Sequence, residues 1–141
     1  MRYLLDTCAI SETTRATPNS AFIKWLDFQN ENDIFLSNMT IGELYKGIFK
    51  LQDKKRQEKL MLWLEEDLKP RFHRRILPVE DSVIYLWGRI SGESEKIGRK
   101  LPIVDSLLAA TAIAHKLTVV SRNVKDFELC SAKVINPWVQ I

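Results

Sequence analysis

The sequence is poor in the residues that build several common kinds of site. It has two cysteines, Cys8 and Cys130, which form no Cys-x-x-Cys pair, and two histidines, His73 and His115. A structural zinc site needs such ligands at characteristic spacings, and a catalytic cysteine needs a histidine partner. The sequence therefore argues against both kinds of site, and its cysteine usage favours a reduced, cytoplasmic setting.

Glycine motifs and long apolar runs are also missing. The five glycines form no G-x-G-x-x-G after a predicted strand, which argues against a nucleotide site of that type. The apolar start at residues 3–5 is too short for a signal peptide, and no apolar run approaches the length of a membrane span. We therefore expect a soluble protein with no membrane partner.

The bulk properties are those of an ordinary globular chain. With 141 residues, 45% of them hydrophobic and 28% charged, the sequence fits a single domain over residues 1–141. The net charge of +3 is too small to identify nucleic acid as a partner. Basic clusters at residues 54–56, 71–75 and 96–100 are interpreted either as solvated helix faces or as a polyanion-binding surface.

Short apolar runs alternate with amphipathic segments along the chain. Strands are predicted at residues 3–5, 34–36, 76–77, 117–120 and 134–135. Helices are predicted at residues 20–28, 40–51, 53–68 with Pro70 as the stop, 82–97 with Gly98 as the stop, and 104–115. Strands that alternate with helices predict an α/β fold in which a mainly parallel sheet of four to five strands lies between helical layers.

Four acidic residues follow predicted strands or begin predicted helices: Asp6, Glu43, Asp105 and Asp126. In an α/β sheet these positions lie along one edge, where such folds place their ligands. Two carboxylates about 5 Å apart repel by about 3 kcal/mol at an effective dielectric constant near 20. Because no Lys or Arg is adjacent to Asp6 or Asp105, the pattern indicates a divalent cation with oxygen ligands.

Each acid also has a purely structural interpretation. Asp6 fits a turn after a strand, and Asp126 fits a cap before Phe127. Glu43 fits a capping box, in which its carboxylate would reach back to the backbone N–H of an N-cap Thr40. Asp105 fits the first turn of a helix, where the helix dipole favours negative charge.

Motifs along almost the whole chain resemble the PIN-domain ribonucleases of the VapC toxin type. The first two are Leu4-Leu5-Asp6-Thr7 and Ser37-x-x-Thr40-x-x-Glu43-Leu44-x-x-Gly47. The others are IVDSLLAATA at residues 103–112, LTVVSRNVKDF at residues 117–127, and Asn136-Pro137-Trp138. Each motif alone is weak, but the complete ordered set is specific.

The resemblance implies a PIN-like three-layer α/β/α sandwich and a Mg²⁺- or Mn²⁺-dependent endoribonuclease, the toxin of a type II toxin–antitoxin pair. It also implies an RNA substrate, a cognate VapB-like antitoxin and a homodimer. Asp6, Glu43 and Asp105 match the family acids. Some relatives carry the fourth acid at the position of Asn123 and others at the position of Asp126, and we predict Asp126.

In the expected mechanism, Asp6 and Asp105 bind the metal, and Glu43 and Asp126 orient water in the metal's shell or complete a second, weaker site. Thr7 and Ser121 are expected to orient ligands or the phosphate. Lys46 and Arg122 are the candidates for the substrate backbone.

Two other functions fit parts of the pattern. An aspartyl phosphotransferase of the haloacid dehalogenase type also has an Asp after its first strand, but it needs a second Asp where this chain has Cys8. A binding module without catalysis would also suit the fold, although unused clustered charge lowers stability.

Overall fold

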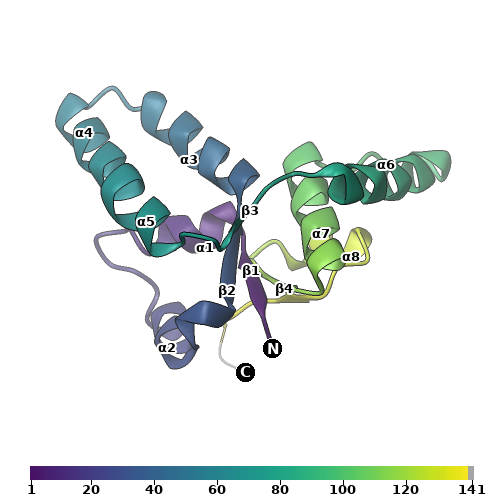
Figure 1. Ribbon diagram of the computed structural model, residues 1–141, viewed down its shortest axis with the longest axis horizontal. Coiled ribbons are helices and arrows are strands. Elements are labelled where there is room, and N and C mark those ends of the chain that lie inside the picture. The colour runs from purple at the N-terminus through teal and green to yellow at the C-terminus, as the bar shows by residue number, and fades with distance from the viewer. Residues whose placement is uncertain (140–141) are drawn as a thin grey trace.

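One parallel sheet runs through the centre of the molecule (Figure 1), and the computed structural model describes residues 1–139. The strands are β1 (Tyr3–Leu5), β2 (Ile34–Ser37), β3 (Ile76–Leu77), β4 (Thr118–Val120) and β5 (Val134–Ile135). They lie in the order β3-β2-β1-β4-β5, and every pairing is parallel. The predicted sheet is therefore confirmed, with all five strands.

Helices cover both faces of this sheet. They are α1 (Thr7–Glu12), α2 (Ser20–Phe28), α3 (Asn38–Phe49), α4 (Lys54–Leu62), α5 (Lys69–Arg71), α6 (Asp81–Lys96), α7 (Ile103–His115) and α8 (Val124–Leu129). A 3-10 turn, η1 (Glu31–Asp33), precedes β2, and a π-helical segment, η2 (Trp63–Leu68), joins α4 to α5. In Figure 1, α3 and α4 form one arm, α6 and α7 form the other, and β1 ends near the base of the V between them.

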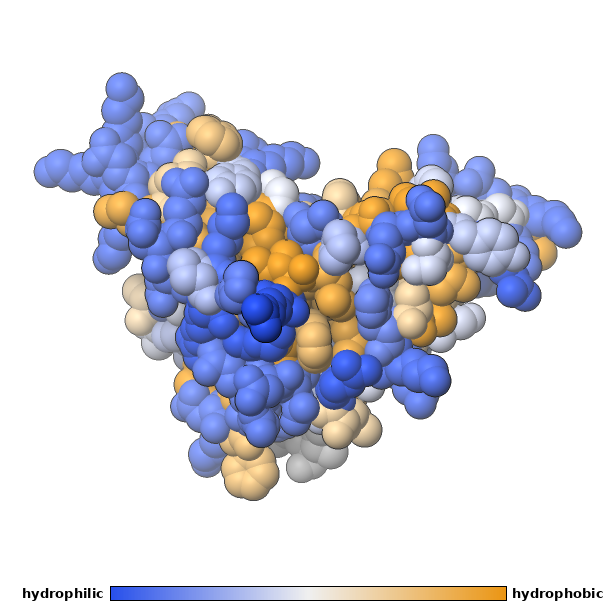
Figure 2. Space-filling view, in the orientation of Figure 1, coloured by the Kyte–Doolittle hydropathy of each residue, from blue (hydrophilic) through white to orange (hydrophobic). Residues whose placement is uncertain are grey.

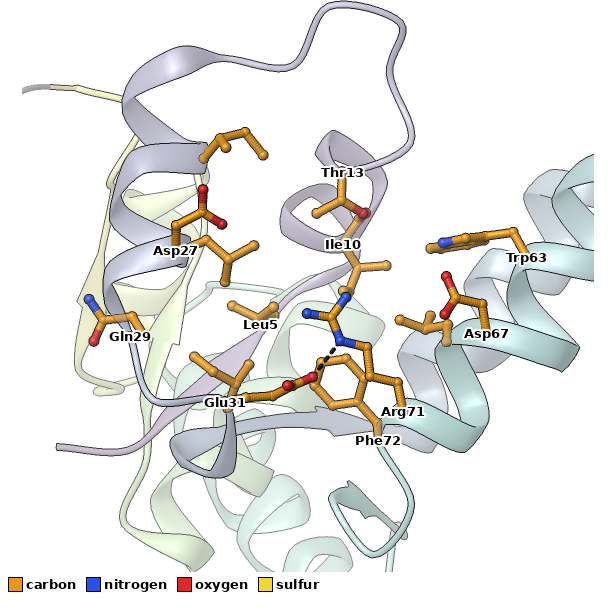
Figure 3. A pocket seen from close by; sticks show the side chains of 14 residues that line it. Leu5, Ile10, Thr13, Asp27, Gln29, Glu31, Trp63, Asp67, Arg71 and Phe72 are labelled. Carbon is orange, nitrogen blue, oxygen red and sulfur yellow. Dashed lines mark hydrogen bonds and ion pairs between the residues drawn. The ribbon is translucent and has the colours of Figure 1, made fainter.

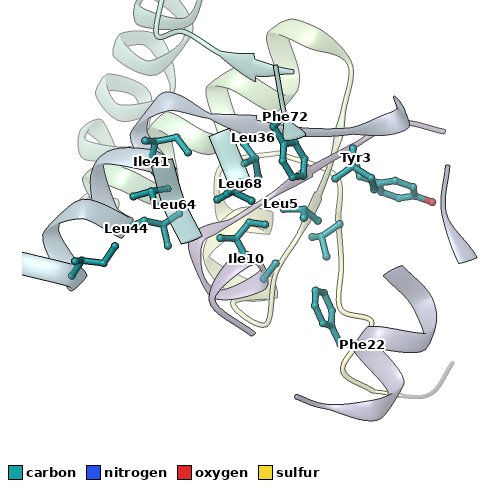
Figure 4. Packing of buried hydrophobic residues seen from close by; sticks show 14 residues of the cluster. Tyr3, Leu5, Ile10, Phe22, Leu36, Ile41, Leu44, Leu64, Leu68 and Phe72 are labelled. Atoms are coloured by element: carbon teal, nitrogen blue, oxygen red, sulfur yellow. The ribbon is translucent and has the colours of Figure 1, made fainter. Parts of the chain in front are cut away.

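The core is divided by the sheet into two clusters. Successive side chains of a strand point to opposite faces, so Tyr3 and Leu5 pack with α1, α2, α3 and η2, whereas Leu4 packs with α7 and α8. Leu4 and Leu5 are 0% and 1% exposed. Figure 4 shows Leu5 beside Ile10 and Leu36 in the first cluster. This arrangement confirms the predicted three-layer α/β/α sandwich.

Several details differ from the sequence prediction. Helices α1 and α8, each of six residues, were not predicted because they are too short to show an amphipathic period. Helix α3 begins at Asn38, since the Ser37 hydroxyl accepts the Met39 N–H at 3.0 Å and acts as the N-cap. The predicted start at Thr40 is therefore wrong.

The helical stretch after α4 also continues beyond its predicted stop. Pro70 lies inside α5, and the π-helical η2 precedes it. A proline nitrogen has no hydrogen for the regular helical ladder, so the proline accompanies an irregular stretch here without ending the helix. Gly98 does end α6: its φ of +80° lies in the left-handed region that favours glycine.

The basic cluster at residues 71–75 has a structural role. Arg71 forms an ion pair with Glu31, and Arg75 donates hydrogen bonds to the carbonyl oxygens of Ile34 and Arg71. Figure 3 shows Arg71 and Glu31 at a cavity of about 400 Å³ that α1, α2, η2 and α5 surround. These arginines fasten α5 to the segment before β2, which supports the structural interpretation of this cluster.

The outer surface is mixed in character. Figure 2 shows apolar side chains gathered between the two arms, with hydrophilic residues toward the tips of both arms. Within residues 1–139, no helix combines the length and the apolar character needed to cross a bilayer.

Candidate active site

The four predicted acids come from four different elements and meet at one end of the sheet. Asp6 follows β1, Glu43 lies in α3, Asp105 lies in the first turn of α7, and Asp126 lies in the first turn of α8. Burial, followed in order of effect by the charges of Asp6, Asp126 and Glu43, raises the pKa of Asp105 to about 6. All three other acids are therefore close enough to destabilise the Asp105 carboxylate.

Asp6 is the most buried of the four, at 3% exposed. Its Oδ1 accepts the backbone N–H of Ala9 at 2.9 Å, which caps α1, and also the thiol of Cys8 at 2.9 Å. These bonds favour the carboxylate, as does the nearby charge of Arg122, yet burial outweighs them and raises the pKa of Asp6. Asp6 is thus a structural N-cap and also part of the acidic cluster.

Glu43 is held by a residue from another helix. The hydroxyl of Thr7 in α1 donates to Glu43 Oε1 at 2.6 Å. The capping-box interpretation of Glu43 is wrong, because Ser37 caps α3 and Thr40 lies within the helix. The Thr40 hydroxyl is buried and has no hydrogen-bond partner among the described residues.

A cavity of about 490 Å³ opens at this cluster. Its lining includes Asp6, Glu43 and Asp105 together with Asn123. Asp126 is not part of the lining, although its charge acts on Asp105. The two candidates for the fourth position thus differ: Asn123 lines the cavity, whereas Asp126 does not line it and acts on Asp105 through its charge.

Of the residues predicted to orient ligands or contact the substrate, only some line the cavity. Thr7 and Arg122 line the cavity. Ser121 is fully buried beneath it, and its hydroxyl accepts the Asn123 N–H at 2.8 Å. Lys46 is exposed on α3 and is not part of the lining.

The donor set suits a hard cation. No group of three His, Cys, Asp or Glu side chains in residues 1–139 is close enough to hold a metal ion by itself. Mg²⁺ commonly keeps several water ligands and takes only one or two carboxylates from the protein. The pair Asp6 and Asp105 fits that requirement, because both carboxyls are partly or fully buried and have raised pKa values that a cation would lower.

Several residues of this site were not identified as site residues from the sequence, among them Cys8, Glu12 and Arg15. All three line the cavity. Burial and the neighbouring charge of Asp6 raise the pKa of the Cys8 thiol to about 11, so it remains a protonated hydrogen-bond donor. Glu12 is a carboxylate that is only 1% exposed. Its position at the end of an unpredicted short helix gave no signal in the sequence.

Comparison with known proteins identifies the family and agrees with the fold. Residues 3–129 match the model of a family described as "PIN domain". The chain is 36% identical over 135 residues to the toxin FitB of Neisseria gonorrhoeae, covering 96% of this chain and 97% of FitB. It is 31% identical over 135 residues to the VapC ribonuclease Y4jK of Sinorhizobium fredii, covering 96% of each. The crystal structure of FitAcB from N. gonorrhoeae aligns with a TM-score of 0.92 and 36% identity over 98% of this chain and 99% of that one.

Proposed function

Because this chain belongs to the PIN-domain family, we propose that it is a metal-dependent endoribonuclease that acts as the toxin of a toxin–antitoxin pair. The relatives' names support both halves of the proposal, one as a ribonuclease and one as a toxin. Both relatives match nearly the full length of this chain.

The observation that carries the proposal is the crowding of carboxylates at and around the cavity. Asp6, Glu43 and Asp105 line the cavity, the charge of Asp126 acts on Asp105, and the pKa of Asp105 is raised to about 6 by burial and these three acidic neighbours. Keeping such a cluster destabilises the folded chain unless a cation binds to it. A divalent cation at Asp6 and Asp105 would lower the pKa of a bound water and offset the negative charge that develops on the phosphodiester.

The chain's own residues have separate tasks in this proposal. Asp6 and Asp105 supply carboxylate oxygens to Mg²⁺ or Mn²⁺. Glu43, oriented by its hydrogen bond from Thr7, orients the attacking water and accepts its proton. Asp126, outside the cavity lining, contributes to the negative potential around Asp105.

In addition to the RNA substrate, we propose two protein partners: a cognate VapB-like antitoxin and a second copy of this chain. The antitoxin follows from the relative that is named a toxin. The second copy is consistent with large apolar side chains that remain exposed on the arms, such as Phe49 at 68% and Tyr85 at 69%.

The test uses purified protein and a mixed-sequence RNA, with Mn²⁺ present and then with excess EDTA. We expect cleavage only with the metal, and we expect Asp6→Asn to abolish it while the thermal unfolding transition is retained. Asp27→Asn is the matched control, since it removes one exposed carboxylate from α2 outside the acidic cavity. Cleavage that continues in EDTA would contradict the metal mechanism, and full activity of Asp6→Asn would contradict the site.

A further inference from the structure

The cavity that holds the acids has a second, cationic part. Arg15, at the turn after α1, and Arg122, two residues after the end of β4, both line it. Arg122 forms no ion pair within residues 1–139, and the only carboxylate paired with Arg15 is Glu12. Two guanidinium groups therefore lie in the same cavity as Asp6, Glu43 and Asp105.

Glu12 is buried, and both of its carboxylate oxygens accept hydrogen bonds. Its Oε1 accepts the indole N–H of Trp138 at 2.9 Å, and its Oε2 accepts the backbone N–H of Asn19 at 2.8 Å. Arg15 donates to both oxygens at 3.2–3.3 Å. The side chain of Glu12 is 0% exposed, whereas that of Arg15 is 60% exposed. Glu12 thus anchors a guanidinium that is itself open to solvent.

The Glu12 carboxylate also contacts Trp138, whose ring lies against the guanidinium of Arg122. The Trp138 ring stacks on Phe22 with centroids 4.5 Å apart, and its N–H is held by Glu12. The guanidinium of Arg122 lies over this ring at 5.2 Å from its centroid, a distance suited to a cation–π interaction. The stacking on Phe22 and the hydrogen bond to Glu12 together fix the orientation of the Trp138 ring that Arg122 contacts.

We propose that Arg15 and Arg122 form a phosphate-binding subsite for the RNA strand next to the scissile bond, and that Glu12 is the positioning residue for both arginines. The proposal rests on the proposed ribonuclease function. Arginine binds phosphate with two parallel N–H donors, so its orientation matters as well as its charge. A buried anchor shared by two arginines fixes that orientation before the RNA arrives.

A plain structural role is the competing explanation. Glu12 connects α1 to the N-terminal side of α2 and to the C-terminal segment that carries Trp138, and these contacts alone would stabilise the fold. The two explanations differ in what a substitution changes. A structural role affects unfolding, whereas a positioning role affects KM, and only as long as the arginines are present.

The experiment measures steady-state cleavage of a short single-stranded RNA with saturating Mn²⁺. The variants are Glu12→Gln, the double variant Arg15→Ala/Arg122→Ala, and the triple variant that combines them. We expect Glu12→Gln to raise KM by roughly tenfold with little change in kcat, and the double variant to raise it at least as much. In the double background, Glu12→Gln should have no further effect on KM.

Salt dependence provides a second measure that needs no change at Glu12. Each phosphate contact on single-stranded nucleic acid contributes about 0.7 to the slope of log affinity against log salt. The double variant should therefore lose about 1.4 from that slope, because it loses two contacts. Lys133→Ala is the control: it removes a positive charge at the start of β5, the opposite end of the sheet, and should leave KM unchanged.

Trp138→Phe provides a second variant in case Glu12→Gln misfolds: it removes the indole N–H that Glu12 binds and keeps a smaller aromatic ring for Arg122. It should raise KM in the same direction. The proposal is overturned if the arginine substitutions leave KM unchanged, or if Glu12→Gln lowers the melting temperature without affecting KM. It is also overturned if Glu12→Gln still raises KM when both arginines are absent. Failure of the proposed function would look different, because the unmodified protein would then show no metal-dependent cleavage at all.

Discussion

Replacing Asp105 with Asn should make the metal-free protein more stable at neutral pH while removing its activity. The pKa of Asp105 is raised from 3.8 to about 6, first by burial and then by Asp6, Asp126 and Glu43. The folded state therefore binds a proton at Asp105 more readily than the unfolded chain does. As pH rises from about 4 to about 6, the unfolded state loses this proton first, and folding stability decreases.

The magnitude follows from the size of the shift. A change of roughly two pKa units corresponds to about 3 kcal/mol at 1.36 kcal/mol per unit. Asp105 is only partly buried, so solvent screening reduces the expected effect to about 1–1.5 kcal/mol. We expect Asp105→Asn to equal the unmodified protein near pH 4 and to exceed its unfolding free energy by that amount at pH 7.5.

The assay is urea unfolding in EDTA at half-unit steps from pH 4 to pH 8, with Asp27→Asn as the control for loss of a negative charge. Added Mg²⁺ at ten times its dissociation constant should stabilise the unmodified protein by about 1.4 kcal/mol and Asp105→Asn by much less. An Asp105→Asn variant that is less stable at pH 7.5, or that shows the same pH dependence as the unmodified protein, would refute the account of crowded carboxylates.

Three other outcomes can be measured directly. At limiting metal concentration, the cleavage rate should decline by about tenfold per pH unit below pH 6, because protonated Asp105 is no longer a metal ligand. A rate–pH profile at a higher metal concentration should show the midpoint of this decline at a lower pH. Thr7→Val removes the hydrogen bond to Glu43 and should lower kcat by about tenfold or more with an unchanged melting temperature, whereas Thr14→Val, outside the cavity lining, should not. Phe22→Ala should lower the unfolding free energy by about 3–5 kcal/mol in urea, because this fully buried ring supports both Trp25 and Trp138.

The order of strands and helices could be predicted because it depends on local patterns. Short apolar runs at β1 and β4, and the helical spacing of α2 and α6, indicate their structure within a few residues. The helices α1 and α8 could not be found this way, since six residues do not complete two helical turns. The start of α3 was misplaced because Ser37 and Thr40 are both acceptable N-caps, and the choice depends on which hydroxyl reaches a free N–H.

The site was partly predictable for the same reason. Asp6 directly follows a strand, and Asp105 lies at a helix start, so the parallel α/β pattern alone places both at one edge. The structural role of Glu43 was assigned wrongly, because its partner Thr7 is 36 positions away in the chain. The choice of Asp126 over Asn123 as the fourth residue stays a prediction: Asn123 lines the cavity, and the charge of Asp126 acts on Asp105.

The sequence by itself determined the α/β fold, the strand positions and the pair of carboxylates at the sheet edge, because these follow from periodicity and from the direction of parallel strands. Only the tertiary structure decided how the other groups around that pair are held. The bond between Glu12 and Trp138 joins residues 126 positions apart, and it places Arg122 and Arg15 in the same cavity as Asp6. Such contacts depend on how helices and chain ends pack together, and no local pattern in the sequence records that packing.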